Sequence, residues 1–189
     1  MSKDSENFKF IFHGNYDVLP IKKYLDKYHS EWLTDTSRQD TYSAHRHTNS
    51  IFIYDIDASW NPGDMYKIET KTNDQDLIEL SLPIINNLEK IHKGKVGKAV
   101  FIKLPPFKNV DKHKDVGGYL ESVRRHHIPI ITNENVSFVI DGEKKFMDVG
   151  EIWEVNNNKM HQVWNEGDTD RIHLLIDIIP NDIIGDHHV

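Results

Sequence analysis

The stretch that decides the fold is HIPIITNENVSFVIDGEKKFMDVGEIWEV, residues 127–155. It contains four short runs rich in β-branched and aromatic residues, at 127–132, 136–141, 144–149 and 151–155. The turn-forming sequences NEN, DGE and VGE separate these runs. Many short strands at regular spacing are typical of a β-sandwich or barrel.

The same pattern continues on both sides of this stretch. Four further segments are predicted as strands, at 50–56, 98–104, 161–164 and 171–179. Helical spacing of apolar residues predicts a helix within 17–33 and a second one at about 80–92. In the second helix, Ser81 is the predicted cap, Pro83 fits the first turn, and Gly94 is expected to end it.

These segments together predict the fold class. We expect a mainly β protein, with a jelly roll or cupin-like barrel and N-terminal supporting helices. The 189 residues are expected to form a single domain, with a helical, substrate-side part at about 1–95 and a β core at about 96–180.

Composition excludes several classes of function. The formal net charge of −7 argues against a nucleic-acid-binding protein. The sequence has no cysteine, so disulfides, thiolate metal sites and a cysteine nucleophile are excluded. No secretory signal is visible, and no apolar run approaches the roughly 20 residues of a membrane span. We therefore expect a cytoplasmic protein without a membrane partner, in which any metal is held by histidine and carboxylate.

His113 and Asp115 are the first candidate metal ligands. In an extended segment, residues two apart project from the same face, so both side chains can reach one metal ion. Such a pair also occurs by chance in charged surface loops, and that reading remains open for each residue taken alone. A third ligand has to come from another segment, and His161 on a later predicted strand is the best candidate.

Arg171 lies ten residues after His161, across the turn sequence NEGDTD. A hairpin centred on this turn would place His161 and Arg171 directly opposite each other on adjacent strands. Two histidines and a carboxylate on one face of a metal form the facial triad of non-haem Fe(II) oxygenases. An arginine beside that triad is suited to the carboxylate of a chelating 2-oxo acid. Arg125 and His127 share a strand face and add a second cation and a neutral donor.

At this point the chain resembles the aspartyl/asparaginyl β-hydroxylase family of Fe(II)- and 2-oxoglutarate-dependent dioxygenases. The likeness covers about residues 38–180 and is carried by FIKLPPFKNVDKHKD, RRHHIPIITNENVSFVIDGE and MDVGEIWEVNNNKMHQVWNEGDTDRIHLLID, and more weakly by HRHTNSIFI. The resemblance implies a double-stranded β-helix, a variant of the jelly roll. Animal members have glycine in place of the acidic ligand, so Asp115 makes this chain more similar to the microbial branch, which includes free-amino-acid hydroxylases and lipid A hydroxylases.

The resemblance also implies roles for individual residues. Fe(II) would be bound by His113, Asp115 and His161, while the distal carboxylate of 2-oxoglutarate would be bound by Arg171. Arg125 and His127 match the family's Arg-x-His motif, which contacts the cosubstrate or lies beside it. O₂ is the remaining cosubstrate. Candidates for contacts to the substrate are Arg38, His45, His47, Thr48 and Trp164.

The expected reaction is hydroxylation of an unactivated C–H bond of a free amino acid or a similar small substrate, with succinate and CO₂ as co-products. One alternative is a hydroxylase that acts on Asp, Asn or Pro in a peptide or protein. A second alternative is a metal-dependent cupin-type enzyme that does not use 2-oxoglutarate. A third is a jelly-roll binding module without catalytic activity, which would not bind metal tightly.

Overall fold

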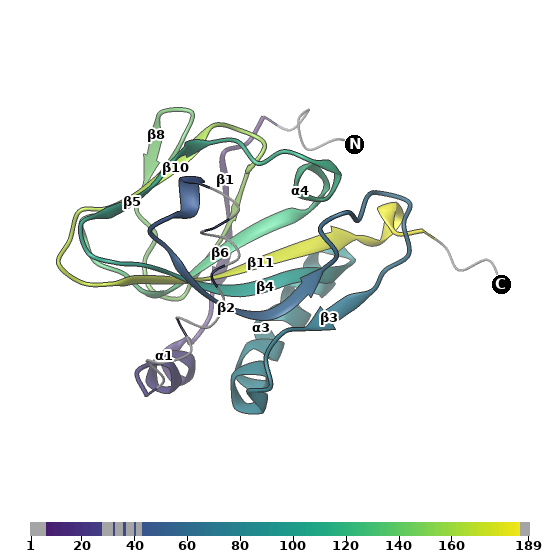
Figure 1. Cartoon of the computed structure of the whole chain (residues 1–189), viewed down its shortest axis with the longest axis horizontal. Helices are drawn as coiled ribbons and strands as arrows, with labels where there is room; N and C mark the ends of the chain where they lie inside the picture. The colour runs from purple at the N-terminus through teal and green to yellow at the C-terminus, as the bar shows by residue number, and fades with distance from the viewer. Residues whose placement is uncertain (1–6, 28–31, 33–35, 37–39, 41–42, 186–189) are drawn as a thin grey trace.

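Two antiparallel β-sheets pack against each other in the computed structural model, which describes residues 7–27, 32, 36, 40 and 43–185 (Figure 1). The large sheet has seven strands in the order β1-β9-β6-β11-β4-β2-β3. Its strands are β1 (Phe10–Asn15), β2 (Asn49–Ile56), β3 (Ile68–Thr70), β4 (Gly94–Leu104), β6 (Arg124–Ile131), β9 (Glu151–Val155) and β11 (Arg171–Pro180). The small sheet has four strands, β5 (Lys108–His113), β10 (His161–Asn165), β7 (Val136–Ile140) and β8 (Glu143–Lys145), in that order.

The chain repeatedly crosses from one sheet to the other. From β4 to β7 each successive strand joins the opposite sheet, and β9, β10 and β11 do the same. This alternation is the winding of a jelly roll and confirms the predicted mainly β, cupin-like fold. All eight predicted strands are present, with ends displaced by up to a few residues.

Helices α1 (Leu19–Leu25) and α3 (Gln75–His92) cover the outer face of the large sheet, below the sheet in Figure 1. Because α1 and α3 cover one face of this sheet and the small sheet covers the other, nine of the ten residues of β11 are buried. One apolar cluster fills the space under the helices, and a second lies between the two sheets.

The second helix begins earlier than the sequence predicted. Asp74 is its N-cap, with a side-chain oxygen that accepts a hydrogen bond from the Leu77 amide (3.0 Å). Ser81 therefore lies inside the helix and donates to the Leu77 carbonyl (2.8 Å), and Pro83 is also internal. The predicted end is correct, because Lys93 adopts a left-handed conformation (φ 47°) directly before Gly94.

Several elements were not predicted. Among them are β1, which pairs with β9 at the edge of the large sheet, β3 and the short helix α4 (Gly118–Ser122). Within 17–33, the range predicted to contain the first helix, the structure shows the helix α1. The rest of that range lies partly outside the described residues. Two short 3₁₀ helices, η3 (Ser43–His45) and η4 (Asn181–Ile183), complete the elements of the described chain. Among the described residues, no helix is both long and apolar enough to cross a membrane.

Candidate metal centre

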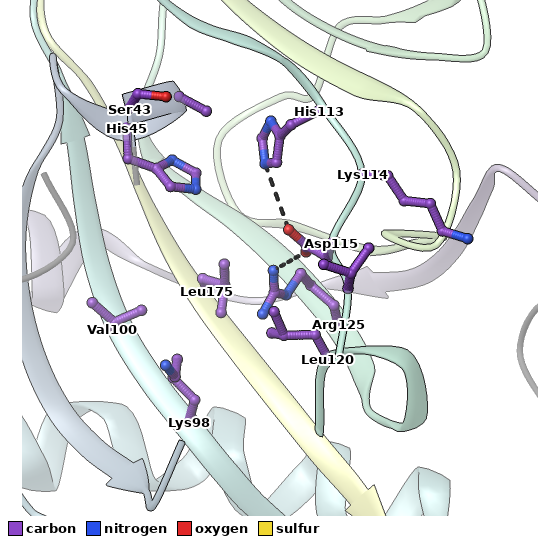
Figure 2. Close-up of a pocket in the computed structure, with 12 residues that line it drawn as sticks. Ser43, His45, Lys98, Val100, His113, Lys114, Asp115, Leu120, Arg125 and Leu175 are labelled. Carbon is purple, nitrogen blue, oxygen red and sulfur yellow. Dashed lines mark hydrogen bonds and ion pairs between the residues drawn. The ribbon is translucent and has the colours of Figure 1, made fainter. Parts of the chain in front are cut away.

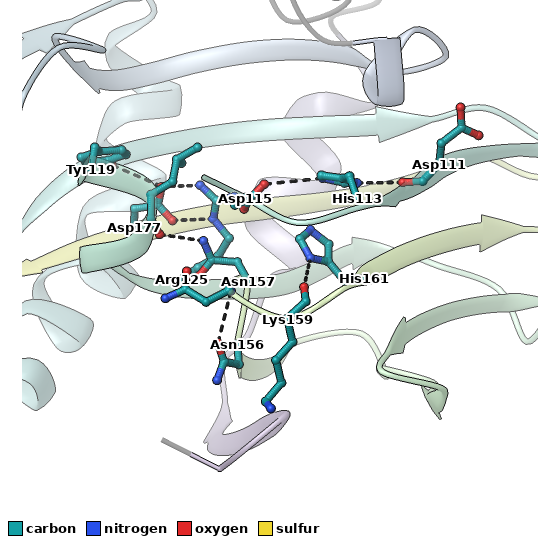
Figure 3. A network of polar contacts seen from close by, with 12 residues as sticks. Asp111, His113, Asp115, Tyr119, Arg125, Asn156, Asn157, Lys159, His161 and Asp177 are labelled. Carbon is teal, nitrogen blue, oxygen red and sulfur yellow. Dashed lines mark hydrogen bonds and ion pairs between the residues drawn. The ribbon is translucent and has the colours of Figure 1, made fainter. Parts of the chain in front are cut away.

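His113, Asp115 and His161 lie together at one end of the space between the sheets (Figure 3). His113 on β5 and His161 on β10 are directly paired across antiparallel strands, with ring centroids 4.2 Å apart. Asp115 follows two residues after His113, and its Oδ1 lies 3.5 Å from His113 Nε2. One possible ligand atom from each residue lies within 4.8 Å of the other two.

Backbone carbonyls fix the orientation of both imidazoles. His113 Nδ1 lies 2.7 Å from the Asp111 carbonyl, and His161 Nδ1 lies 2.9 Å from the Lys159 carbonyl (Figure 3). A carbonyl can only accept a hydrogen bond, so the proton sits on Nδ1 and Nε2 carries the lone pair. This arrangement is the usual one for histidines that bind metal through Nε2.

Charge around the cluster also suits a cation. Burial alone would raise the pKa of Asp115, but the positive charge of Arg125 holds it well below its usual range. Burial lowers the pKa of His161 to about 4. At neutral pH the site therefore has an ionised carboxylate and a neutral His161, the states in which these groups bind a metal. Two imidazoles and one carboxylate with this orientation fit a divalent first-row metal with open positions.

Arg125 is held by two carboxylates. Its Nε and Nη2 donate to the two oxygens of Asp177 at 2.8 and 2.7 Å, and its Nη1 donates to Oδ2 of Asp115 (Figures 2 and 3). The Tyr119 hydroxyl donates to Asp177 Oδ2 (3.2 Å). Asp177 is fully buried and Arg125 is 8% exposed. Arg125 thus orients one of the candidate metal ligands directly.

The predicted hairpin between His161 and Arg171 is wrong. His161 lies on β10 of the small sheet, whereas Arg171 begins β11 of the large sheet, where it pairs with Leu104. The reason is that residues 166–170 carry the chain across the sandwich and do not fold β11 back onto β10. The two side chains nevertheless line one cavity between the sheets, together with His113, Arg125 and His127.

Arg171 is a buried cation in this cavity, 2% exposed. Its Nη2 donates to Nδ1 of His173 (2.9 Å), on the same face of β11. Burial and the Arg171 charge hold the pKa of His173 well below its usual range, so this imidazole is neutral. His127, on β6, has its ring 5.8 Å from that of His173 and 5.0 Å from that of Phe138. Arg171 therefore lies beside one neutral imidazole, that of His173, and His127 lies on the neighbouring strand.

A second cavity, of about 330 Å³, opens beside the candidate metal ligands (Figure 2). It shares His45, His113, Arg125 and Leu175 with the first cavity, the inner one that contains Arg171, and Asp115 also lines it. Two lysines, Lys98 and Lys114, add positive charge to its wall. The arrangement thus comprises an inner cavity that contains an arginine and an outer cavity that contains two lysines.

The predicted substrate residues differ in their position relative to the two cavities. His45 on η3 lines both cavities, and its ring lies 5.0 Å from that of His113. Thr48 is buried and donates to the His45 carbonyl (2.9 Å), so it supports η3. His47 does not line either cavity. Trp164 is 40% exposed and faces away from the cavities, because Val163 is the inward residue on that part of β10. Arg38 lies outside the described residues.

Sequence reasoning missed Asp177, Tyr119, His173 and the two cavity lysines. For Asp177 a signal was present, since it is the only carboxylate in the apolar run RIHLLIDII. A buried carboxylate requires a cationic or hydrogen-bonding partner. The identity of that partner, Arg125, could not be read from the sequence, because 52 residues separate the two.

Comparison with known proteins gives a family match over most of the chain. The profile described as aspartyl/asparaginyl beta-hydroxylase matches residues 21–180. No curated protein matches the sequence.

Two solved structures share the fold. An oxidoreductase of the 2OG-Fe(II) oxygenase family from Burkholderia pseudomallei is 10% identical, with a TM-score of 0.54, over 74% of this chain and 71% of that one. The viral collagen prolyl hydroxylase of Paramecium bursaria Chlorella virus-1, in a 2OG complex, is 6% identical, with a TM-score of 0.57, over 91% of this chain and 96% of that one. At such identities the likeness shows the fold alone.

Proposed function

Because the chain belongs to the aspartyl/asparaginyl β-hydroxylase family and is thus a 2-oxoglutarate-dependent hydroxylase, we propose that it hydroxylates a free amino acid or a similar small molecule. The observation that carries the proposal is the position of His113, Asp115 and His161 between two cavities. The inner cavity contains the buried Arg171, and the outer one has a volume of about 330 Å³, near the lower end for ligand sites.

His113, Asp115 and His161 would hold Fe(II). With 2-oxoglutarate and O₂, the bound metal supplies the oxidising power for C–H hydroxylation, and succinate and CO₂ are the co-products. Arg171 would bind the distal carboxylate of 2-oxoglutarate, a charge-assisted contact that is strong in a buried site. His127 lies on the wall of the same cavity and would contact the cosubstrate or lie beside it. Arg125 holds Asp115 ionised and in place, which makes it a positioning residue.

The outer cavity would bind the substrate. Lys98 and Lys114 can attract a carboxylate, while Val100, Leu120 and Leu175 give apolar contacts. His45, at the boundary of the two cavities, is the substrate candidate that the geometry supports best. A zwitterionic amino acid with a short side chain matches this mixture of charge and apolar surface. The acidic net charge of −7 supports the absence of a nucleic-acid partner, and the lack of cysteine is compatible with the predicted cytoplasmic location.

The test is an anaerobic titration of metal-free protein with Fe(II) and then with 2-oxoglutarate, followed by the visible charge-transfer absorption of the chelated complex. We expect the band in the wild type and in Arg46→Ala, which removes an exposed arginine outside both cavities. We expect no band in His113→Ala, and a requirement for at least tenfold more 2-oxoglutarate in Arg171→Ala. Succinate release is then screened with free amino acids and with peptides containing Asp, Asn or Pro.

Each result separates the alternatives. Fe(II) binding without the band would favour a cupin-type enzyme that does not use 2-oxoglutarate. Succinate release that is coupled to peptides but not to free amino acids would move the substrate to a peptide or protein. Absence of metal binding would leave a jelly-roll binding module and end the proposal.

A further inference from the structure

A second cluster of side chains of the types that bind metals lies on the helix-covered face of the large sheet, opposite to the face that lines the cavities. It consists of His13 on β1, His92 at the end of α3, His126 on β6 and Glu154 on β9. One possible ligand atom from each lies within 4.8 Å of the others. In β6, His126 stands between Arg125 and His127, which line the inner cavity, so strand alternation directs His126 to the helix-covered face.

We propose that these four residues form a second metal site, which binds a zinc-type divalent cation and is separate from the candidate Fe(II) centre. The donor set is three imidazoles and one carboxylate, a combination that zinc accepts in tetrahedral coordination. The site lies under α3, away from both cavities, so its role would be structural.

The distances within the cluster suit such an ion. Nε2 of His92 lies 2.9 Å from Nε2 of His126, and Nε2 of His13 lies 3.0 Å from Oε2 of Glu154. The ligand atoms of tetrahedral zinc lie roughly 3.3–3.6 Å apart, as follows from bond lengths of about 2.0–2.2 Å. The two hydrogen-bonded pairs, at 2.9 and 3.0 Å, are slightly closer than this spacing, and all four ligand atoms lie within 4.8 Å of one another. Small side-chain movements would therefore complete the coordination.

Neighbouring groups hold the ligands in the necessary orientation. His126 Nδ1 lies 3.3 Å from the Ile176 carbonyl, which leaves Nε2 as the lone-pair atom facing His92. Arg124 donates to Oε1 of Glu154 (3.1 Å), while Oε2 faces the cluster. Hydrogen bonds of this kind, on the far side of a ligand, are typical of metal sites, and His126 and Glu154 both have one. His126 is fully buried and Glu154 is 1% exposed.

The cluster can also be satisfied without a metal, as two hydrogen-bonded pairs, His92 with His126 and His13 with Glu154. The metal reading is favoured because three imidazole rings converge, with ring centroids 4.7 to 5.4 Å apart. It also explains why the residues come from four elements. A bound ion would link β1 and the end of α3 to β6 and β9. It would thereby stabilise the position of β6, the strand that carries Arg125 and His127.

The experiment counts bound zinc in the full chain after chelator treatment and reloading. His113→Ala removes one ligand of the candidate Fe(II) centre and isolates the second site. We expect His113→Ala to retain one zinc per chain, and to retain it when His47→Gln is added, since His47 lies outside both clusters. Adding His13→Gln or His92→Gln should abolish the remaining zinc binding. Both positions are partly exposed, so these variants are expected to fold, which far-UV circular dichroism checks.

Cobalt provides a readout that needs no variant of the second site. Co(II) added to His113→Ala should give the intense visible absorption of tetrahedral coordination, and zinc should raise the thermal unfolding temperature of this variant. If His113→Ala retains no zinc, or retains it unchanged in both glutamine variants, the proposal is overturned and the cluster is a hydrogen-bonded polar network. Neither result depends on 2-oxoglutarate or on activity, so the proposed function is tested separately.

Discussion

Asp177→Asn should destabilise the protein strongly, because Asp177 is the main counter-charge of a buried arginine. The carboxylate accepts two hydrogen bonds from Arg125 and one from Tyr119. Asparagine has nearly the same shape, so it creates no cavity. It removes the negative charge and replaces one acceptor oxygen with an NH₂ group, which faces donors. Asp115 then remains as the only carboxylate in hydrogen-bond contact with Arg125 among the described residues.

The magnitude follows from the burial of the pair. Asp177 is fully buried and Arg125 is 8% exposed, so water does not replace the lost charge. Removal of one partner of a buried ion pair costs about 3–5 kcal/mol of unfolding free energy. For a chain of this length the thermal midpoint falls by roughly 2–4 °C per kcal/mol, so a decrease of about 6–20 °C is expected. Fe(II) affinity should also fall, because Arg125 can shift towards Asp115.

The assay is urea unfolding of metal-free protein, followed by tryptophan fluorescence. Asp55→Asn is the matched control on the same sheet: Asp55 pairs with Lys98 (3.1 Å), but its side chain is 20% exposed, so about 1 kcal/mol or less is expected. The double variant Arg125→Met/Asp177→Leu should recover only part of the loss, since it removes the Arg125–Asp177 pair but leaves the buried Asp115 without its arginine partner. A cost below about 1 kcal/mol for Asp177→Asn would refute the reasoning, which rests on the loss of the main counter-charge of a buried arginine.

Three further changes test the fold by the same unfolding assay. Asp74→Ala removes the N-cap of α3 and should cost about 1 kcal/mol; an unchanged midpoint would contradict the cap assignment. Leu88→Ala, at a fully buried position of α3, should cost about 2–5 kcal/mol; a loss below this range would mean that the helix packs loosely on the sheet. Gly150→Ala should cost more than about 1 kcal/mol, because Gly150 has φ +82° and a Cβ there would collide with the Tyr16 carbonyl; a neutral effect would show that this turn can relax.

Local patterns predicted most of the strands and the fold class, but not how distant segments meet. The HxD pair and the strand character of 161–164 and 171–179 could be read from the sequence, because alternation and turn residues are local signals. The position of Arg171 relative to His161 could not, since a turn sequence does not show whether the next strand pairs with the previous one or crosses to another sheet. The start of α3 was misplaced because Pro83 was read as a first-turn residue, whereas it lies inside the helix at an exposed position.

The second cluster had a partial signal. Alternation along β6 predicts that His126 faces away from Arg125 and His127, and a histidine on that face requires polar partners. His13, His92 and Glu154 lie between 28 and 113 residues away in the chain, so only the tertiary structure identifies them. The sequence therefore indicated where to look on β6 without naming the site.

The division of the inner cavity between two sheets has a consequence for cosubstrate choice. His113 and His161 belong to the small sheet and Arg171 to the large one. Under the proposed assignment, the dicarboxylic acid would extend from the metal to the arginine. The thickness of the apolar layer between the sheets would therefore determine which length of acid fits. Substitutions that thin or thicken this layer, at positions such as Val110 or Val163, would then change the preferred chain length of the acid without altering the residues that would bind its carboxylates.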